Sequence, residues 1–189
     1  HSGPREHCEL DFFGGEPLMN WHVVQQTIDY VHKQEKKHGK KIKMSLTTNG
    51  LLLDKEKVKY LTDNHISLIL SLDGRKEMHD RMRPGVHGEG TYDEIVKNLQ
   101  YCVANRKGEE YYVRGTFTRY NMDFTTDVID MIDKGFPAVS MEPVVGEDTA
   151  DYSIKEEDLP RVKAEYDRLA KLFIAREEEG RPFFFFHFN

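Results

Sequence analysis

The chain has 189 residues, of which 38% are hydrophobic and 32% are charged, and its formal net charge is −6 at pH 7. This length suits one domain with a sizeable core, and the acidic balance argues against nucleic-acid binding as the main role. No apolar run reaches the roughly 18 residues of a membrane-spanning helix, so no membrane partner is expected. Two isolated cysteines, Cys8 and Cys102, indicate a reducing, cytoplasmic location without a disulfide framework.

The first predicted element is a buried strand over residues 8–13, which ends in a tight turn. Gly14 and Gly15 permit positive φ and let a ligand approach bare backbone, and Pro17 fixes the direction in which the chain leaves the turn. Glu16 would then stand at the carboxyl end of the strand, where its carboxylate could hold an ammonium group. An ordinary strand-to-helix turn is the alternative interpretation of these four residues.

Hydrophobic periodicity predicts alternating helices and strands over the rest of the chain. A helix capped by Asn20 and ended by Gly39 follows the turn. Residues 75–91 are predicted to be a long loop, because they contain three glycines and no helical periodicity. The other predicted strands are 42–48, 66–72, 111–118 and 138–145, and the other predicted helices are 54–63, 92–103, 128–132 and one from about residue 159.

This alternation predicts an α/β fold with a parallel sheet and right-handed crossovers. Ligands of such sheets bind at the carboxyl ends of the strands. Strand ends are also polar simply because they meet solvent, but that accounts for one or two polar tips better than for five. After Glu16, the predicted tips are Thr47-Thr48-Asn49-Gly50, Ser71-Leu72-Asp73-Gly74, Thr116-Phe117-Thr118 and Glu142-Pro143.

The run Gly-Gly-Glu-Pro after a strand resembles the second hallmark of the radical S-adenosylmethionine (SAM) enzymes, which binds the methionyl amino group of SAM. Four further motifs resemble the branch that modifies peptides and proteins and carries a C-terminal (SPASM-type) domain for auxiliary iron–sulfur clusters. Within that branch, residues 11–20 look most like the maturases of six-cysteine (SCIFF) peptides, which form thioether cross-links. The four motifs are Thr47-Thr48-Asn49-Gly50, Ser71-Leu72-Asp73-Gly74, His79-Asp80-x-x-Arg83 and Gly88-Glu89-Gly90-Thr91-Tyr92.

The resemblance implies a partial (βα)6 TIM-like barrel of parallel strands, here truncated to roughly strands two to six, with SAM as a cofactor. Carried over by residue, it implies that the turn binds the SAM amino group and that three strand tips face the SAM ribose or carboxylate. The turn residues are Gly14, Gly15, Glu16 and Pro17, and the tip residues are Asn49, Ser71 and Asp73.

Three residues keep an alternative interpretation. Arg114 is a candidate partner of a carboxylate, since a guanidinium binds one bidentately, and a surface ion pair is the equal alternative. Asn49 could equally be a turn residue in the left-handed region. His79 is expected to pack within its loop rather than to catalyse a reaction.

The sequence departs from this family in one respect, because the motif Cys-x-x-x-Cys-x-x-Cys is absent. Cluster iron needs thiolates, and Cys8 and Cys102 lie far apart in strand and helix patterns. A 4Fe–4S cluster is therefore expected in the full-length enzyme and not in this chain, which is interpreted as an internal fragment. Residues 1–180 would form the barrel core, and residues 181–189, with the run Phe183 to Phe186, would begin a truncated auxiliary-cluster region with exposed phenylalanines.

The expected function is that of the SAM-binding core of a peptide maturase that forms thioether cross-links in a ribosomally made, cysteine-rich peptide. The fragment itself would be inactive, and its open barrel edge makes self-association plausible. An enzyme like the anaerobic sulfatase maturases is one alternative. A non-catalytic α/β module that binds peptides is the other.

Overall fold

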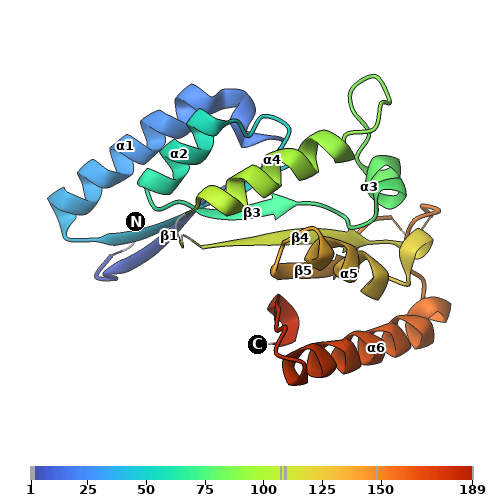
Figure 1. Cartoon of the computed structure of the whole chain (residues 1–189). Helices are drawn as coiled ribbons and strands as arrows, with labels where there is room; N and C mark the ends of the chain where they lie inside the picture. The colour runs from blue at the N-terminus through green and yellow to red at the C-terminus, as the bar shows by residue number, and fades with distance from the viewer. Residues whose placement is uncertain (1–2, 107, 109, 148, 189) are drawn as a thin grey trace. The chain divides into compact units, whose positions relative to one another are not determined.

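A computed structural model describes residues 3–106, 108, 110–147 and 149–188 (Figure 1). The chain divides into two compact units. Unit 1 comprises residues 1–71 and 97–111, and unit 2 comprises residues 72–96 and 112–189. Strands alternate with helices in both units, and each strand runs parallel to its partners within its unit. The predicted α/β fold with parallel strands is therefore confirmed.

In the described part of unit 1, three strands pair in chain order. The first pair runs in register from His7 opposite Lys41 to Phe12 opposite Leu46. In the second pair, Ser45 lies opposite Ser67. The elements are β1 (His7–Phe12), the 3-10 turn η1 (Pro17–Asn20), α1 (Trp21–His38), β2 (Lys41–Thr48), α2 (Lys55–Asp63), β3 (Ser67–Ser71) and the second half of α4 (Tyr92–Asn105).

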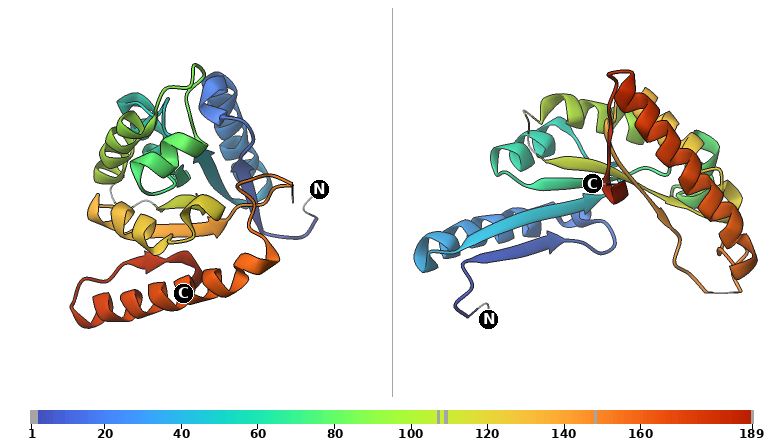
Figure 2. Two further views of the ribbon diagram at one scale, coloured as in Figure 1. Left: turned by 90° about the vertical axis from the view of Figure 1, so that its right-hand side faces the viewer. Right: turned by 90° about the horizontal axis from the view of Figure 1, so that it is seen from below.

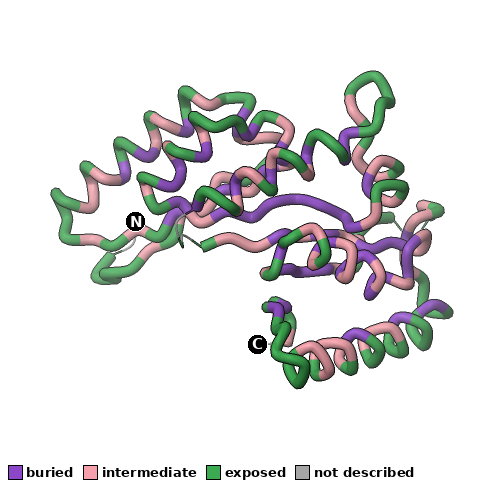
Figure 3. Tube along the Cα trace, in the orientation of Figure 1, coloured by how far each residue is buried: buried purple, intermediate pink, exposed green. Residues whose placement is uncertain are grey.

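The core of unit 1 lies where α1 and α2 cover one face of these strands (Figures 1 and 3). Helix α1 buries Val24, Ile28 and Val31, at the spacing of one helix face. It ends at Gly39 with φ of 62°, as predicted. The Asp54 carboxylate caps α2 by accepting the Lys57 N–H, which also confirms the predicted start. The Asn20 side chain makes no capping bond to α1.

Strand β1 is less buried than predicted, since its residues alternate between exposed and intermediate. The exposed positions are His7, Glu9 and Asp11, whose polar side chains gain nothing from burial on that face. The positions between them lie in register with Ile42, Met44 and Leu46 of β2, on the face that the helices cover. The prediction of a strand was correct, but the prediction that it is buried was wrong.

Unit 2 pairs β4 (Tyr111–Phe117) with β5 (Ala138–Pro143), and β5 with the short β6 (Phe184–Phe185). Helix α5 packs on β5, and α6 packs on α5. The chain after α6 returns alongside that helix (Figure 2), where Phe183 and Phe188 both contact Phe173. The other elements are α3 (Lys76–Met82), the start of α4, η2 (Arg119–Asn121), α5 (Thr125–Asp133), η3 (Glu156–Asp158), α6 (Leu159–Glu178) and η4 (Phe186–Phe188).

Two further predictions for unit 2 were wrong in part. The region predicted as a loop over 75–91 contains the helix α3, whose inward residues include the buried His79, so it has no apolar stripe to reveal it. The C-terminal phenylalanines are not all exposed, because strand alternation buries Phe183 and Phe185 and leaves Phe184 and Phe186 at 44% and 49% exposure. Among the helices of the described residues, none has the length and apolarity that crossing a membrane requires.

Candidate functional site

The carboxylate of Glu16 is fixed at the carboxyl end of β1 by three hydrogen bonds within unit 1. Its Oε1 accepts the Leu18 N–H at 3.1 Å and the Thr48 hydroxyl at 2.9 Å, and its Oε2 accepts the Asn49 N–H at 2.8 Å. Thr48 ends the neighbouring strand β2. Glu16 therefore joins the tips of two strands and also caps η1.

The turn before Glu16 has the predicted positive φ at one of its two glycines, Gly14, and not at Gly15. Gly14 has φ of 121°, a value that only glycine adopts readily. A Cβ on either Gly14 or Gly15 would meet no atom within 4 Å, so the backbone here is open. Pro17 begins η1, where its missing N–H costs nothing.

The geometry of Glu16 suits an ammonium group. A carboxylate offers about four acceptor positions, and the three protein donors leave one on Oε2 without a partner in the part of the chain that the structure describes. Glu16 is half-buried, so this position can meet a ligand. A fixed, partly dehydrated carboxylate makes a stronger charge-assisted hydrogen bond than a mobile surface one.

Two other predicted residues of unit 1 lie at neighbouring strand tips. The Asn49 side-chain oxygen accepts the Leu51 N–H at 3.0 Å, so this residue does shape a turn. Its backbone N–H binds Glu16, so it also belongs to the Glu16 site. Ser71 is buried at the last position of β3.

In unit 2, the predicted residue Asp73 is only 2% exposed, and both its oxygens are engaged. Arg83 binds it bidentately, with Nε at 2.7 Å from Oδ2 and Nη2 at 3.1 Å from Oδ1. Oδ1 also accepts the Thr116 N–H at 2.9 Å. Arg114 is half-buried in the middle of β4. A cavity of about 170 Å³ in this unit is lined by Asp73, Met82, Arg83, Thr116, Thr118 and Val144.

His79 is buried, but it lies on helix α3 and not within the predicted loop, and it takes part in the hydrogen bonding. Its Nδ1 accepts the Asp73 N–H at 3.3 Å, and its Nε2 lies 3.3 Å from the Thr91 Oγ1. Burial lowers the pKa of this imidazole. Sequence reasoning named Arg83 and Thr91 only as parts of motifs and missed Thr48 and Thr116 as hydrogen-bond partners. The motifs themselves were the signal for the first two.

The residues of this chain do not fit an iron–sulfur cluster. Cys8 is half-buried in β1, and Cys102 is buried in α4, where burial raises its thiol pKa to about 11. A cluster requires several deprotonated thiolates, and the chain has two cysteines. Within the described ranges, no group of three or more His, Cys, Asp or Glu residues could hold a metal ion.

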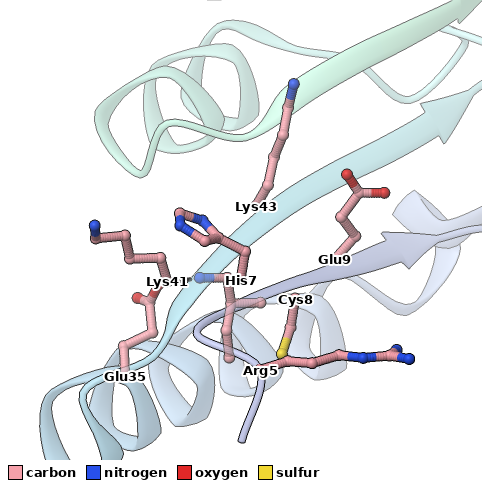
Figure 4. Close-up of a pocket in the computed structure, with 8 residues that line it drawn as sticks. Arg5, His7, Cys8, Glu9, Glu35, Lys41 and Lys43 are labelled. Atoms are coloured by element: carbon pink, nitrogen blue, oxygen red, sulfur yellow. Dashed lines mark hydrogen bonds between the residues drawn. The ribbon is translucent and has the colours of Figure 1, made fainter. Parts of the chain in front are cut away.

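A cavity of about 690 Å³ lies at the other end of β1 and β2, near their first residues (Figure 4). Charged side chains line it, but several are already paired. Lys41 binds Glu6 at 2.8 Å, Lys43 binds Glu110 at 2.7 Å, and Glu35 accepts the Ile42 N–H at 2.7 Å. Lys41, Lys43 and Glu35 of this cavity are therefore already engaged with partners in the protein.

The fold is similar to that of several solved structures. The structure described as native anSMEcpe with bound AdoMet and Kp18Cys peptide superposes with a TM-score of 0.86 at 22% identity, covering 99% of this chain and 52% of that chain. SuiB of Streptococcus suis, bound to S-adenosylmethionine, gives a TM-score of 0.63 at 18% identity, covering 89% and 37%. At these identities the likeness shows the fold. It matches the partial barrel that the sequence predicted.

Curated proteins are similar to part of the chain. A cysteine-type anaerobic sulfatase-maturating enzyme of Clostridium novyi is 29% identical over 109 residues, 57% of this chain and 28% of its own length. The radical SAM cyclopropyl synthase TigE of Paramaledivibacter caminithermalis is 28% identical over 117 residues, 60% of this chain and 24% of its own. The chain thus spans about a quarter of the length of these relatives.

The family itself follows from a match that extends over more than half of the chain. The model of the Radical SAM superfamily matches residues 9–132, which include the Gly-Gly-Glu-Pro turn and the strand tips that carry Asn49, Ser71 and Asp73. The chain belongs to the radical SAM superfamily.

Proposed function

We propose that this chain is the SAM-binding core of a radical SAM enzyme that modifies a peptide. In this proposal, Glu16 binds the methionyl amino group of SAM, and Gly14, Gly15 and Pro17 shape the turn that presents it. The observation that carries the proposal is the fixed Glu16 carboxylate with one open acceptor position. The AdoMet-bound structural neighbours support it.

The other SAM contacts are proposed for each unit by itself. In unit 1, Asn49 and Ser71 stand at the tips of β2 and β3 and offer hydrogen bonds to hydroxyl or carboxylate oxygens. In unit 2, Arg114 offers a guanidinium, which suits the SAM carboxylate. Asp73 is not proposed as a SAM contact, because it is only 2% exposed and already binds Arg83 and the Thr116 N–H.

We propose that the ligands of the 4Fe–4S cluster come from a part of the protein outside these 189 residues, since this chain supplies two separated cysteines. Residues 1–180 are the proposed barrel core, and residues 181–189 are the proposed start of an auxiliary-cluster region. On this proposal the 189 residues alone carry out no radical chemistry. A cytoplasmic location and self-association through the open edge of β1 remain predictions.

Two substrate classes remain for the whole enzyme. The sequence resemblance favours thioether formation in a ribosomally made, cysteine-rich peptide. The second class is a cysteine side chain in a protein substrate. It is favoured by the similarity to cysteine-type anaerobic sulfatase-maturating enzymes. The structural neighbour anSMEcpe is described with a bound peptide. Both classes require a polypeptide substrate, which is the part of the proposal that they share.

The test is SAM binding to this chain, measured by ligand-observed NMR because affinity without a cluster is expected to be weak. The comparison ligand is 5′-methylthioadenosine, which lacks the amino and carboxyl groups. We expect Glu16→Gln to weaken SAM binding about tenfold, the loss of one charged contact of about 1.4 kcal/mol, and to leave 5′-methylthioadenosine unaffected.

Glu6→Gln is the matched control, because Glu6 is an exposed carboxylate that pairs with Lys41 at the opposite end of β1. This variant should bind SAM like the parent chain. The proposal fails if Glu16→Gln binds SAM as tightly as Glu6→Gln, or if the chain binds 5′-methylthioadenosine and SAM equally well.

A further inference from the structure

We propose that Asp73, His79, Arg83 and Thr91 form a closed hydrogen-bonded ring that positions Arg114 on β4. We call these four residues the Asp73 ring. The proposal deepens the proposed function, on which it rests, because Arg114 is the suggested partner of the SAM carboxylate. It makes Asp73 a positioning residue rather than a ligand of SAM.

The ring closes through four consecutive contacts in unit 2. The Asp73 N–H donates to His79 Nδ1 at 3.3 Å, and His79 Nε2 lies 3.3 Å from Thr91 Oγ1. The Thr91 hydroxyl donates to the Arg83 carbonyl at 2.8 Å, and Arg83 Nε returns to Asp73 Oδ2 at 2.7 Å. Because Nδ1 accepts and the Thr91 hydroxyl is already a donor, the imidazole must be neutral with its proton on Nε2.

Burial makes this arrangement specific. His79 is fully buried, and Asp73 and Thr91 are 2% and 6% exposed. A polar group left without its partner in such a place costs about 1–3 kcal/mol. Asp80 also holds Thr91 in place, since its Oδ1 accepts the backbone N–H groups of Thr91 and Tyr92 at 2.8 and 2.9 Å. The segment from the end of β3 to the start of α4 is thus held as one piece.

Leu72 and Asp73 form hydrogen bonds with the backbone of β4 on both sides of Gly115. The Leu72 N–H donates to the Arg114 carbonyl at 3.1 Å, and Asp73 Oδ1 accepts the Thr116 N–H at 2.9 Å. The Leu72 carbonyl approaches so closely that a Cβ on Gly115 would lie 2.7 Å from it. The backbone that carries Arg114 is therefore fixed by residues 72 and 73, which the ring in turn holds.

Acid would disrupt the ring. Protonated His79 would carry a proton on Nδ1, which could then no longer accept the Asp73 N–H. Four groups that face the imidazole are Asp73, which follows β3, Asp80 in α3, Arg83 at the end of α3, and the aromatic ring of Tyr92 in α4. Burial, the largest influence, lowers the pKa of His79. Neutral His79 is therefore the form that the ring holds at physiological pH.

The experiment uses the 189-residue chain and NMR signals of three groups: the His79 ring nitrogens, the Thr116 amide and the Arg114 Nε–H. Asp73→Ala removes both functions of the carboxylate, whereas Asp73→Asn keeps an acceptor for the Thr116 N–H. Arg83→Lys keeps the charge but not the bidentate geometry. Asp123→Asn is the control, since Asp123 pairs with Arg75 elsewhere in unit 2.

We expect a Nε2-protonated His79 in the parent chain. The Arg114 and Thr116 signals should move in Asp73→Ala, move less in Asp73→Asn and Arg83→Lys, and stay in place in Asp123→Asn. SAM affinity should follow the same order, with a loss of about tenfold for Asp73→Ala. Melting temperatures measured in parallel identify a variant that has simply unfolded, and Asp73→Asn then carries the comparison.

A Nδ1-protonated His79, or Arg114 and Thr116 signals that do not change in folded Asp73→Ala, would overturn the ring whatever SAM does. If the parent chain binds no SAM while these signals shift as expected, the proposed function fails for this chain and the positioning of Arg114 stands. If SAM binds and folded Asp73→Ala binds it equally well, the positioning role is wrong and the proposed function survives.

Discussion

At the scale of single residues, the site depends on groups whose neighbours are fixed by the fold. Glu16 could be found from the sequence, because two glycines, a carboxylate and a proline after a strand are an informative pattern. Its partner Thr48 could not, since the contact joins residues 32 positions apart and only strand register brings them together. The sequence therefore predicted the candidate carboxylate and not the donor that orients it.

Gly115 provides the test at this scale. A Cβ there would lie 2.7 Å from the Leu72 carbonyl and 2.8 Å from the Met141 Cε, and the backbone carbonyl cannot move without disturbing β4. We expect Gly115→Ala to lower the free energy of unfolding by about 1–3 kcal/mol, as overpacking does. Urea denaturation measures this. Gly15→Ala, where a Cβ meets nothing within 4 Å, should change it by less than about 0.5 kcal/mol.

An equal effect of the two substitutions would mean that residues 72 and 115 are not in the close contact described here. A loss of stability in Gly115→Ala alone would support the close contact between Leu72 and β4. It would also explain why this strand position, which lies between Arg114 and Thr116, has no side chain.

At the scale of elements, the helices with an apolar stripe were predictable and the helix without one was not. Helices α1 and α6 each bury apolar residues on one face, with Val24 and Ile28 four residues apart in α1 and Val162 and Leu169 seven residues, about two turns, apart in α6. Helix α3 instead turns His79 inward and secures α4 through Asp80. Hydrogen bonds stabilise it in place of hydrophobic contact, so periodicity arguments cannot detect it.

His79 gives α3 a measurable dependence on pH. Because burial lowers its pKa in the folded chain, the unfolded chain takes up the proton more readily. The contribution of neutral His79 is thus fully present above the ordinary pKa of 6.5, and it is lost progressively as pH falls below that value. We expect the free energy of unfolding to decline from pH 7.5 to 5.5.

Urea denaturation at several pH values checks this, with His79→Gln as the comparison. Asp127 has its pKa raised by burial, which acts in the opposite direction at more acidic pH, so measurements stay above pH 5.5. The variant should be less stable than the parent at pH 7.5, and its stability should vary less with pH. A parent whose stability rises on acidification would contradict a neutral, buried His79.

At the scale of the whole molecule, the alternation of strands and helices was predictable because apolar strands and amphipathic helices differ in period. The division into two units was not, since α4 contributes residues to both and no linker marks the boundary. The strand tips in each unit were found from the rule that ligands bind at carboxyl ends. The hydrogen bonds within each unit, such as the one from Arg83 to Asp73, could not be predicted from the sequence, because they depend on the three-dimensional fold.

The absence of a cluster-binding motif leads to the last prediction. Anaerobic reconstitution of this chain with iron and sulfide should give no stoichiometric cluster, because about four cysteine ligands bind such a cluster in most proteins and Cys102 is held as a buried thiol. Iron analysis and absorption spectra measure the outcome. The variant with both Cys8→Ala and Cys102→Ala distinguishes adventitious iron from iron bound by the two thiols. It should retain as much adventitious iron as the parent chain. About four iron atoms per chain that are lost in this variant would show that the two thiols do bind a cluster, through an arrangement different from the one described here.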